Sequence, residues 1–242
     1  MAITNTQSGT NLHEVADRIY RINTPVALPG DAAFSFNQYL VDDDDPLLFH
    51  TGLRGLFPLV REAVEHVMPV ARLRHVAFSH FEADECGALN QWLAAAPNAT
   101  PLCGTIAAMV SVTDYADRAP RALADGEAVS LGRHTVRWID APHLPHGWEC
   151  GFLMEESTRT LLCGDLFTQP GTGQTPLTEG DILGPSEAFR HEMDYFSHSR
   201  NADELLEKLA LMQPRTLACM HGSAWHGDGA GLLRALAAEL RR

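Results

Sequence analysis

Four side chains that can bind metal lie within six residues of the sequence: His80, Glu82, Asp84 and Glu85. In an extended chain, side chains point the same way at every second residue, so His80, Glu82 and Asp84 are expected to converge. Clustered carboxylates raise one another's pKa values unless a cation neutralises them. The pattern therefore predicts one half of a site for two metal ions.

Four further segments place ligand-type residues after predicted strands. His143 and His146 follow residue 139, Asp165 follows the apolar residues 161–163, and His221 ends the segment 216–221. His50, after residues 47–49, is the weakest of the set. In α/β folds, ligands collect where the carboxyl ends of strands open into loops. We therefore expect these loops to meet the loop of His80. Spacing favours His143 as the ligand, which leaves His146 to support the site or relay protons.

Alternative interpretations exist for single residues of this set. Carboxylates are favourable at a helix N-terminus, which would account for Asp84 and Glu85 but not for His80. Asp165 could cap a turn after a glycine. Tyr195 could reach the site from a predicted helix over residues 186–199, although a packed tyrosine is the commoner role.

The elements that must position these residues follow from apolar periodicity. The run 76–78 predicts a short buried strand before the acidic loop, and the spacing of Leu89, Trp92 and Leu93 predicts a helix over residues 84–96. Residues 35–41 and 47–49 predict a hairpin, and helices are expected over 202–212 and 231–240. The order of strands and helices in two halves predicts an α/β fold, a four-layer αβ/βα sandwich forming one domain over residues 1–242.

Composition narrows the class of protein. The 242 residues carry a formal net charge of −13, which argues against nucleic acid or an anionic membrane as partner. The polar N-terminus and the lack of a long apolar run predict neither a signal peptide nor a membrane span. Five dispersed cysteines without a C-x-x-C pair indicate reduced thiols and a cytoplasmic location.

The ordered set of ligand-type residues resembles the metallo-β-lactamase superfamily. Zinc hydrolases of that superfamily carry H-x-H-x-D-H, whereas this chain has Glu82 in place of the second histidine. A glutamate there is similar to the diiron branch, which comprises the flavodiiron proteins and shorter oxygen-binding diiron proteins. The segments from His143 to His146 and from His221 to Trp225 are similar to H-W-P-D and H-G-x-x-W of that branch. The resemblance covers roughly residues 12–225.

The resemblance implies two iron ions bridged by Asp165. The implied ligands are His80, Glu82, His143 and Asp165 for the first ion, and Asp84, Asp165 and His221 for the second. Such mixed nitrogen and oxygen ligands suit iron or manganese, with zinc as a further alternative. The implied function is binding or reduction of dioxygen or nitric oxide, with protons from His146 or Glu85. Members of this branch tend to be homodimers.

Three departures from the branch are visible. Glu85 stands where the family motif ends in histidine, so it could bind the second metal, hydrogen-bond a metal-bound water, or leave the second site weak. His50 and Thr51 stand where relatives more often carry an Asp-Thr pair. No segment resembles a phosphate-cradling loop for a flavin, so electrons are expected from an external reductase.

Two other function classes remain open. A dinuclear zinc-type hydrolase would use a metal-bound hydroxide to attack a thioester, lactone or phosphoester, but Glu82 in place of histidine disfavours it. A metal-binding sensory or partner module without catalysis is compatible with the departures at Glu85 and His50.

Overall fold

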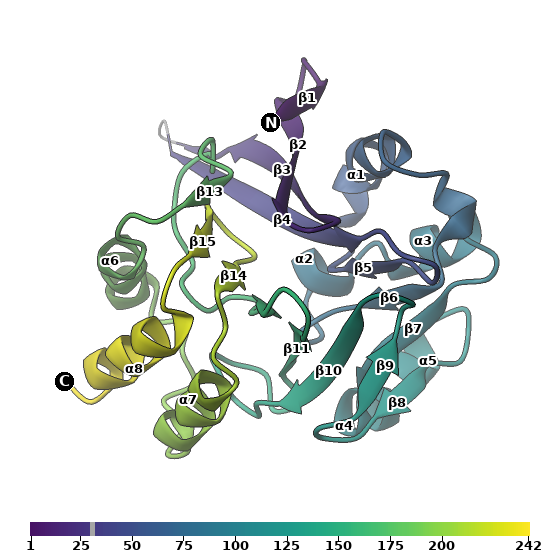
Figure 1. Ribbon diagram of the computed structural model, residues 1–242. Coiled ribbons are helices and arrows are strands. Elements are labelled where there is room, and N and C mark those ends of the chain that lie inside the picture. Colours follow the sequence, from purple (N-terminus) through teal and green to yellow (C-terminus); the bar gives the residue numbers. More distant parts are fainter. Residues whose placement is uncertain (30–31) are drawn as a thin grey trace.

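The computed structural model describes residues 1–29 and 32–242 and contains two β-sheets that pack face to face (Figure 1). The first sheet has eight strands in chain order: β1 (Ala2–Asn5), β2 (Thr10–Ala16), β3 (Ile19–Ala27), β4 (Ala33–Val41), β5 (Leu47–Phe49), β6 (His75–Ala77), β7 (Thr100–Gly104) and β8 (Arg121–Leu123). The second has seven, in the spatial order β13 (Leu177–Thr178), β15 (Ala224–His226), β14 (Thr216–Ala218), β12 (Thr160–Leu162), β11 (Gly151–Glu155), β10 (Thr135–Asp140) and β9 (Ala128–Ser130).

Helices cover the outer faces of both sheets (Figure 1). The helical segments of the first half are η2 (Arg54–Leu56), α1 (Phe57–Glu65), η3 (Val70–Arg72), α2 (Ala83–Cys86), α3 (Leu89–Ala95), α4 (Thr105–Ala107), the π-helical turn η4 (Ala108–Val112) and α5 (Thr113–Tyr115). Those of the second half are α6 (Leu183–Met193), α7 (Ala202–Leu211) and α8 (Gly229–Leu240).

Three apolar clusters define the layers. The inner faces of the two sheets enclose Tyr39 and Phe49 of the first sheet with Trp138 and Leu153 of the second. A second cluster joins α1 and α3 to the outer face of the first sheet, with Trp92 fully buried. A third joins α7 and α8 to the second sheet. Removing this apolar surface from water stabilises the stack, at roughly 25 cal/mol per Å². The arrangement is the predicted αβ/βα sandwich.

The strand directions explain why distant loops meet. Strands β5 to β8 run parallel, and β12 runs parallel to β14, so the loops that follow β6, β12 and β14 open on one edge of the stack. Backbone hydrogen bonds tie these loops together across the two sheets. Gly151 N donates to Ser79 O at 2.9 Å, and Asn37 N donates to Met220 O at 2.8 Å. The predicted convergence of strand ends is therefore present.

The helix predicted over residues 84–96 is two helices, α2 and α3. The Ala88 N–H, which would continue the helical ladder, bonds instead to Gly52 O and Thr51 Oγ1 at 3.1 and 3.0 Å. The second predicted helix, over residues 186–199, ends at Met193, because Asp194 adopts a left-handed conformation with φ +49°. Tyr195 therefore lies in a loop and not on a helix.

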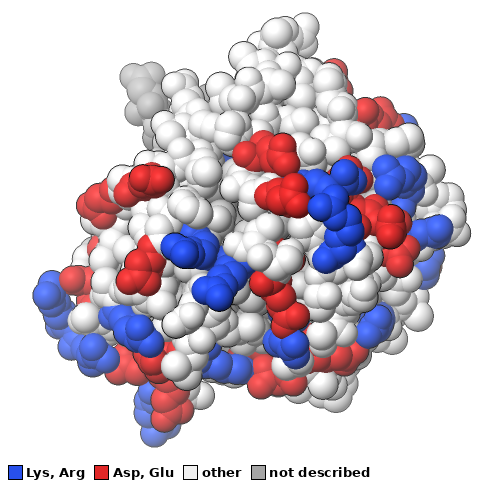
Figure 2. All heavy atoms as spheres, in the orientation of Figure 1, with Lys and Arg blue, Asp and Glu red and all other residues white. Residues whose placement is uncertain are grey.

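Charged side chains of both signs lie intermixed over the face seen in Figure 2. None of the helices within residues 1–29 and 32–242 has the length and apolar character needed to cross a bilayer.

Candidate metal centre

The first group of ligand-type atoms gathers around Glu82. The nitrogen Nε2 of His80 and that of His146 each lie 3.0 Å from Glu82 Oε2. The oxygen Oδ2 of Asp165 lies 3.7 Å from His80 Nε2 and 3.4 Å from His146 Nε2. Each of the four residues offers one atom, and these atoms all lie within 4.8 Å of one another. This spacing suits a single cation between them.

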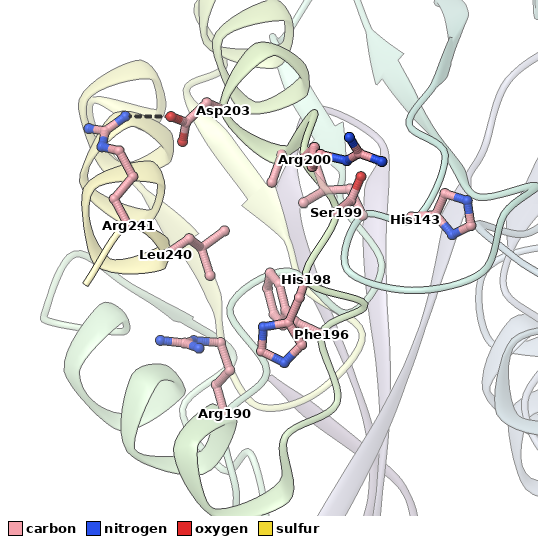
Figure 3. A pocket seen from close by; sticks show the side chains of 11 residues that line it. His143, Arg190, Phe196, His198, Ser199, Arg200, Asp203, Leu240 and Arg241 are labelled. Carbon is pink, nitrogen blue, oxygen red and sulfur yellow. Dashed lines mark hydrogen bonds and ion pairs between the residues drawn. The ribbon is translucent and has the colours of Figure 1, made fainter.

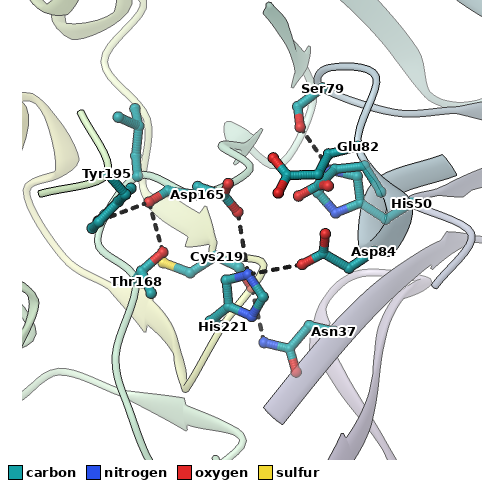
Figure 4. Close-up of polar contacts among 12 residues, drawn as sticks. Asn37, His50, Ser79, Glu82, Asp84, Asp165, Thr168, Tyr195, Cys219 and His221 are labelled. Carbon is teal, nitrogen blue, oxygen red and sulfur yellow. Dashed lines mark hydrogen bonds and ion pairs between the residues drawn. The ribbon is translucent and has the colours of Figure 1, made fainter. Parts of the chain in front are cut away.

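A second group gathers beside the first and consists of Asp84, Glu85 and His221. The nitrogen Nε2 of His221 lies 3.5 Å from Asp84 Oδ2, as Figure 4 shows. Its other nitrogen, Nδ1, donates to Ser35 O at 2.9 Å. Because a carbonyl only accepts, this contact keeps the proton on Nδ1 and leaves Nε2 free to bind a metal.

Asp165 joins the two groups. Its Oδ2 faces His80 and His146, whereas its Oδ1 lies 3.3 Å from His221 Nε2. The preceding residue, Gly164, has φ +52°, and a side chain there would place Cβ 2.9 Å from the hydroxyl oxygen of Ser79. Only glycine permits this close approach. The two oxygens of Asp165 are thus positioned as a bridge.

Glu85 provides the test of whether these residues suit a metal. Its side chain is fully buried, and its carboxylate oxygens have no hydrogen-bond partner among the described residues, although Oε2 lies 3.9 Å from His80 Nε2. Burial raises its pKa well above the usual value, and the nearby charges of Asp165 and Asp84 raise it further. An unpaired buried carboxylate is costly unless a cation compensates it. The donor set of imidazoles and carboxylates fits iron or manganese.

Charge pairing lowers the pKa values of two other carboxylates and raises those of two imidazoles. Hydrogen bonds from His146 and then from His80 lower the pKa of Glu82 to about 2. Burial alone would raise the pKa of Asp165, but the hydrogen bond and charge of His221 lower it below the usual range. Burial opposes the protonation of His146 and His221, yet Glu82 raises the pKa of the first and Asp165 that of the second. Without metal, protons on His146 and His221 would balance part of the carboxylate charge.

Of the predicted site residues, the structure brings together His80, Glu82, Asp84, Glu85, Asp165 and His221, but not His143. His143 is exposed and lines a separate cavity of about 220 Å³ with Ser199 and Arg200 (Figure 3). Its backbone has φ +65°, and its N–H donates to Gly147 O at 2.8 Å, so the turn directs it away from the centre. The preference for His143 over His146 is corrected.

His146 belongs to the first group and does not stand behind it. Its Nε2 lies 3.0 Å from Glu82 Oε2, and its Nδ1 lies 2.9 Å from Tyr195 O and donates to it. A role for His146 in proton transfer stays a prediction. Tyr195 itself stands beside the site: its hydroxyl donates to Asp165 O at 3.4 Å (Figure 4), and burial raises its pKa above the usual range.

Sequence reasoning missed the polar residues that hold the loop of His221. Asn37 Nδ2 donates to Cys219 O and Gly222 O at 2.9 and 2.8 Å, and Arg21 Nη2 donates to Gly222 O at 2.6 Å. Both side chains are fully buried on strands β3 and β4. Polar residues inside otherwise buried strands were the available indication, since buried polar groups need partners.

Comparison with known proteins places this chain in a family. A family model described as ODP family beta lactamase matches residues 34–222, which is most of the chain. The chain belongs to the ODP family. No curated protein matches this ODP-family chain.

Solved structures resemble the ODP-family chain in fold. The rubredoxin oxygen:oxidoreductase of Desulfovibrio gigas is 18% identical with a TM-score of 0.77, and the match covers 96% of this chain and 61% of that one. The flavodiiron protein of Giardia intestinalis is 17% identical with a TM-score of 0.80, covering 95% and 59%. A fragment of a putative diflavin flavoprotein from Nostoc sp. is 16% identical with a TM-score of 0.83, covering 96% and 95%.

These likenesses show the metallo-β-lactamase fold in the form that flavodiiron proteins have. The chain spans about 60% of the length of the first two proteins, since the match covers 61% and 59% of them.

Proposed function

We propose that the chain is a non-haem diiron protein that binds or reduces dioxygen. The observation that carries the proposal is the placement of Asp165, whose two oxygens face two separate groups of ligand-type atoms. Glu82 in the first group makes that group richer in oxygen than a three-histidine zinc site. Oxygen-rich mixed donors favour iron or manganese over zinc.

The proposed ligands divide between the two groups. His80, Glu82, His146 and Asp165 would hold the first ion, and Asp84, Glu85, Asp165 and His221 the second. Two ferrous ions held there would supply electrons for the reduction of dioxygen. The fully buried Glu85 would act as a ligand, which accounts for its lack of a hydrogen-bond partner among the described residues.

The surrounding residues orient the donors and handle protons. The carbonyls of Tyr195 and Ser35 fix the rings of His146 and His221 so that Nε2 faces the centre. Protons are proposed to come from Glu85 or His146. Tyr195, the third candidate catalytic residue, lies outside the two ligand sets, and its hydroxyl donates to the backbone carbonyl of Asp165.

Electrons are proposed to come from an external reductase, in line with the expectation from the sequence. The similar solved structures include a rubredoxin oxygen:oxidoreductase and a flavodiiron protein, which supports this chemistry by analogy. Nitric oxide is the second gas to test. A homodimer in the cytoplasm completes the proposal, and the five cysteines, all buried as free thiols, support a reducing compartment.

The experiment compares iron-loaded and zinc-loaded protein. With a chemical electron donor, the iron-loaded protein should consume dioxygen, and Asp165→Asn should abolish most of that uptake. Hydrolysis of a thioester, lactone or phosphoester by the zinc-loaded protein, without oxygen uptake by the iron-loaded form, would establish the hydrolase instead. Metal binding without either activity would indicate a sensory or partner module.

A further inference from the structure

His50 is a buried histidine that neither group of ligands uses. It follows strand β5, is fully buried, and adopts φ +65°, a costly backbone conformation for a residue with a Cβ. Its N–H donates to Ala77 O at 2.8 Å, and its ring centroid lies 4.3 Å from that of Phe49. A buried imidazole needs a hydrogen-bond partner to offset its loss of water.

That contact leads to the metal centre through Ser79. The nitrogen Nε2 of His50 lies 3.1 Å from Ser79 Oγ, and Ser79 Oγ lies 3.0 Å from His80 Nδ1. The three residues are 0%, 1% and 2% exposed, so water does not compete for these hydrogen bonds. Figure 4 shows Ser79 and His50 next to Glu82, on the opposite side of the cluster from Tyr195.

Ser79 has little freedom to leave this position. Its carbonyl accepts from Gly151 N at 2.9 Å, which ties it to the second sheet. The backbone of Gly164, just before Asp165, packs so closely that a Cβ there would lie 2.9 Å from the Ser79 hydroxyl oxygen. The hydroxyl is therefore held between the two rings.

The two hydrogen bonds that join His80, Ser79 and His50 can be donated in either direction along this chain of side chains. A metal on His80 Nε2 requires the proton of that ring on Nδ1, which then donates to Ser79 Oγ. The single hydroxyl proton of Ser79 is left to donate to His50 Nε2, so His50 carries its own proton on Nδ1. In the reverse direction His50 Nε2–H donates to Ser79, Ser79 donates to His80 Nδ1, and His80 Nε2–H faces Glu82, 3.0 Å away.

We propose that Ser79 and His50 are positioning residues that select the metal-binding tautomer of His80, and that His50 changes its own tautomer when the metal leaves. This inference rests on the proposed metal centre. A carboxylate at residue 50 could only accept a hydrogen bond, whereas a neutral imidazole can accept or donate. His50 therefore allows the metal-free centre to keep its hydrogen bond between His80 and Glu82.

The direct test reads histidine tautomers by heteronuclear NMR of the side-chain nitrogens. Zinc serves as the diamagnetic probe, and the metal-free protein is the reference. We expect His50 protonated on Nδ1 in the zinc-loaded protein and on Nε2 in the metal-free protein. Protonation on Nε2 in the zinc-loaded protein, or the same tautomer in both states, would overturn the inference.

Metal affinity gives a second, independent readout. Loss of a hydrogen-bond partner behind a metal-bound histidine typically weakens binding 10- to 100-fold. Ser79→Ala should show about this loss for the first zinc or ferrous ion in a chelator competition, and Ser79→Thr should restore it. His50→Leu should weaken binding and His50→Gln should retain it, because a glutamine amide also accepts or donates.

The outcomes separate this inference from the proposed function. Wild-type affinity in Ser79→Ala, with an unchanged circular dichroism spectrum, would overturn the positioning role while leaving the metal centre intact. Failure of the wild-type protein to bind any divalent metal would overturn the proposed function and, with it, this inference.

Discussion

His146 Nε2 lies 3.0 Å from Glu82 Oε2, whereas the side chain of His143, three residues earlier in the same loop, is exposed and lines a different cavity. His146→Ala should therefore remove one donor from the first group and greatly weaken binding of the first iron. His143→Ala is the matched control and should keep wild-type iron content. Metal analysis of both variants checks this. Equal loss in both, or loss only in His143→Ala, would refute the assignment.

Glu85 should destabilise the metal-free protein. Its raised native pKa means that the native state holds a proton that the unfolded state loses above its own pKa of about 4.3. The contribution of this group to the free energy of unfolding is therefore largest at low pH. It falls as the pH rises from about 4.3 toward the raised native pKa. Glu85→Gln stays neutral and should be more stable near pH 7, by about 1–3 kcal/mol in urea unfolding with chelator present.

The same variant should bind the second metal poorly. Glutamine removes an anionic donor from the group of Asp84 and His221. Competition titrations with ferrous iron should show one tight site in Glu85→Gln and two in wild type. Glu65→Gln, on the surface of α1, is the control and should bind two ions. Two tight sites in Glu85→Gln would show that Glu85 is not a ligand.

Metal binding should strengthen with rising pH. The pKa values of His146 and His221 are raised, so in the metal-free protein these groups contribute stability below about pH 6.5 and lose it as the pH rises through their native pKa values. Metal must displace these protons, and binding therefore releases them. Affinities for zinc measured between about pH 6 and 8 should increase with pH. A flat profile would contradict this picture.

The polar residues of β4 should stabilise the loop of His221. Asn37→Leu leaves the Gly222 carbonyl without one of its donors and removes a second bond, to Cys219 O, so it should cost about 1–3 kcal/mol of unfolding free energy. Tyr39→Phe removes only the hydroxyl bond to Cys219 O and should cost about 1 kcal/mol. Chemical denaturation of both variants measures the difference. A larger loss in Tyr39→Phe would refute this account.

The sequence allowed the strand ends to be predicted because apolar runs followed by ligand-type residues mark them. His80, Glu82, Asp165 and His221 were found in this way and lie together. The choice between His143 and His146 was beyond such reasoning, since it depends on the left-handed turn at His143. The number of residues between strand and ligand does not encode that turn.

Burial and tertiary hydrogen bonds were the other missing information. The sequence left the role of Glu85 open because its full burial depends on tertiary contacts, such as the bond from Thr51 N to Glu85 O at 2.7 Å from another loop. The same holds for Ser79 and His50, which are neighbours only after the sheet forms. A single domain over residues 1–242 stays a prediction.

The measurement that tests the bridging role of Asp165 most directly is iron content combined with magnetic susceptibility. Protein loaded with ferrous iron without air and then oxidised should hold two irons per chain, and the two ferric ions should be magnetically coupled because they share a bridging carboxylate. Asp165→Asn should lose that coupling. Uncoupled ferric iron in the wild type, one iron per chain, or stoichiometric zinc in protein isolated without added metal would contradict the diiron account.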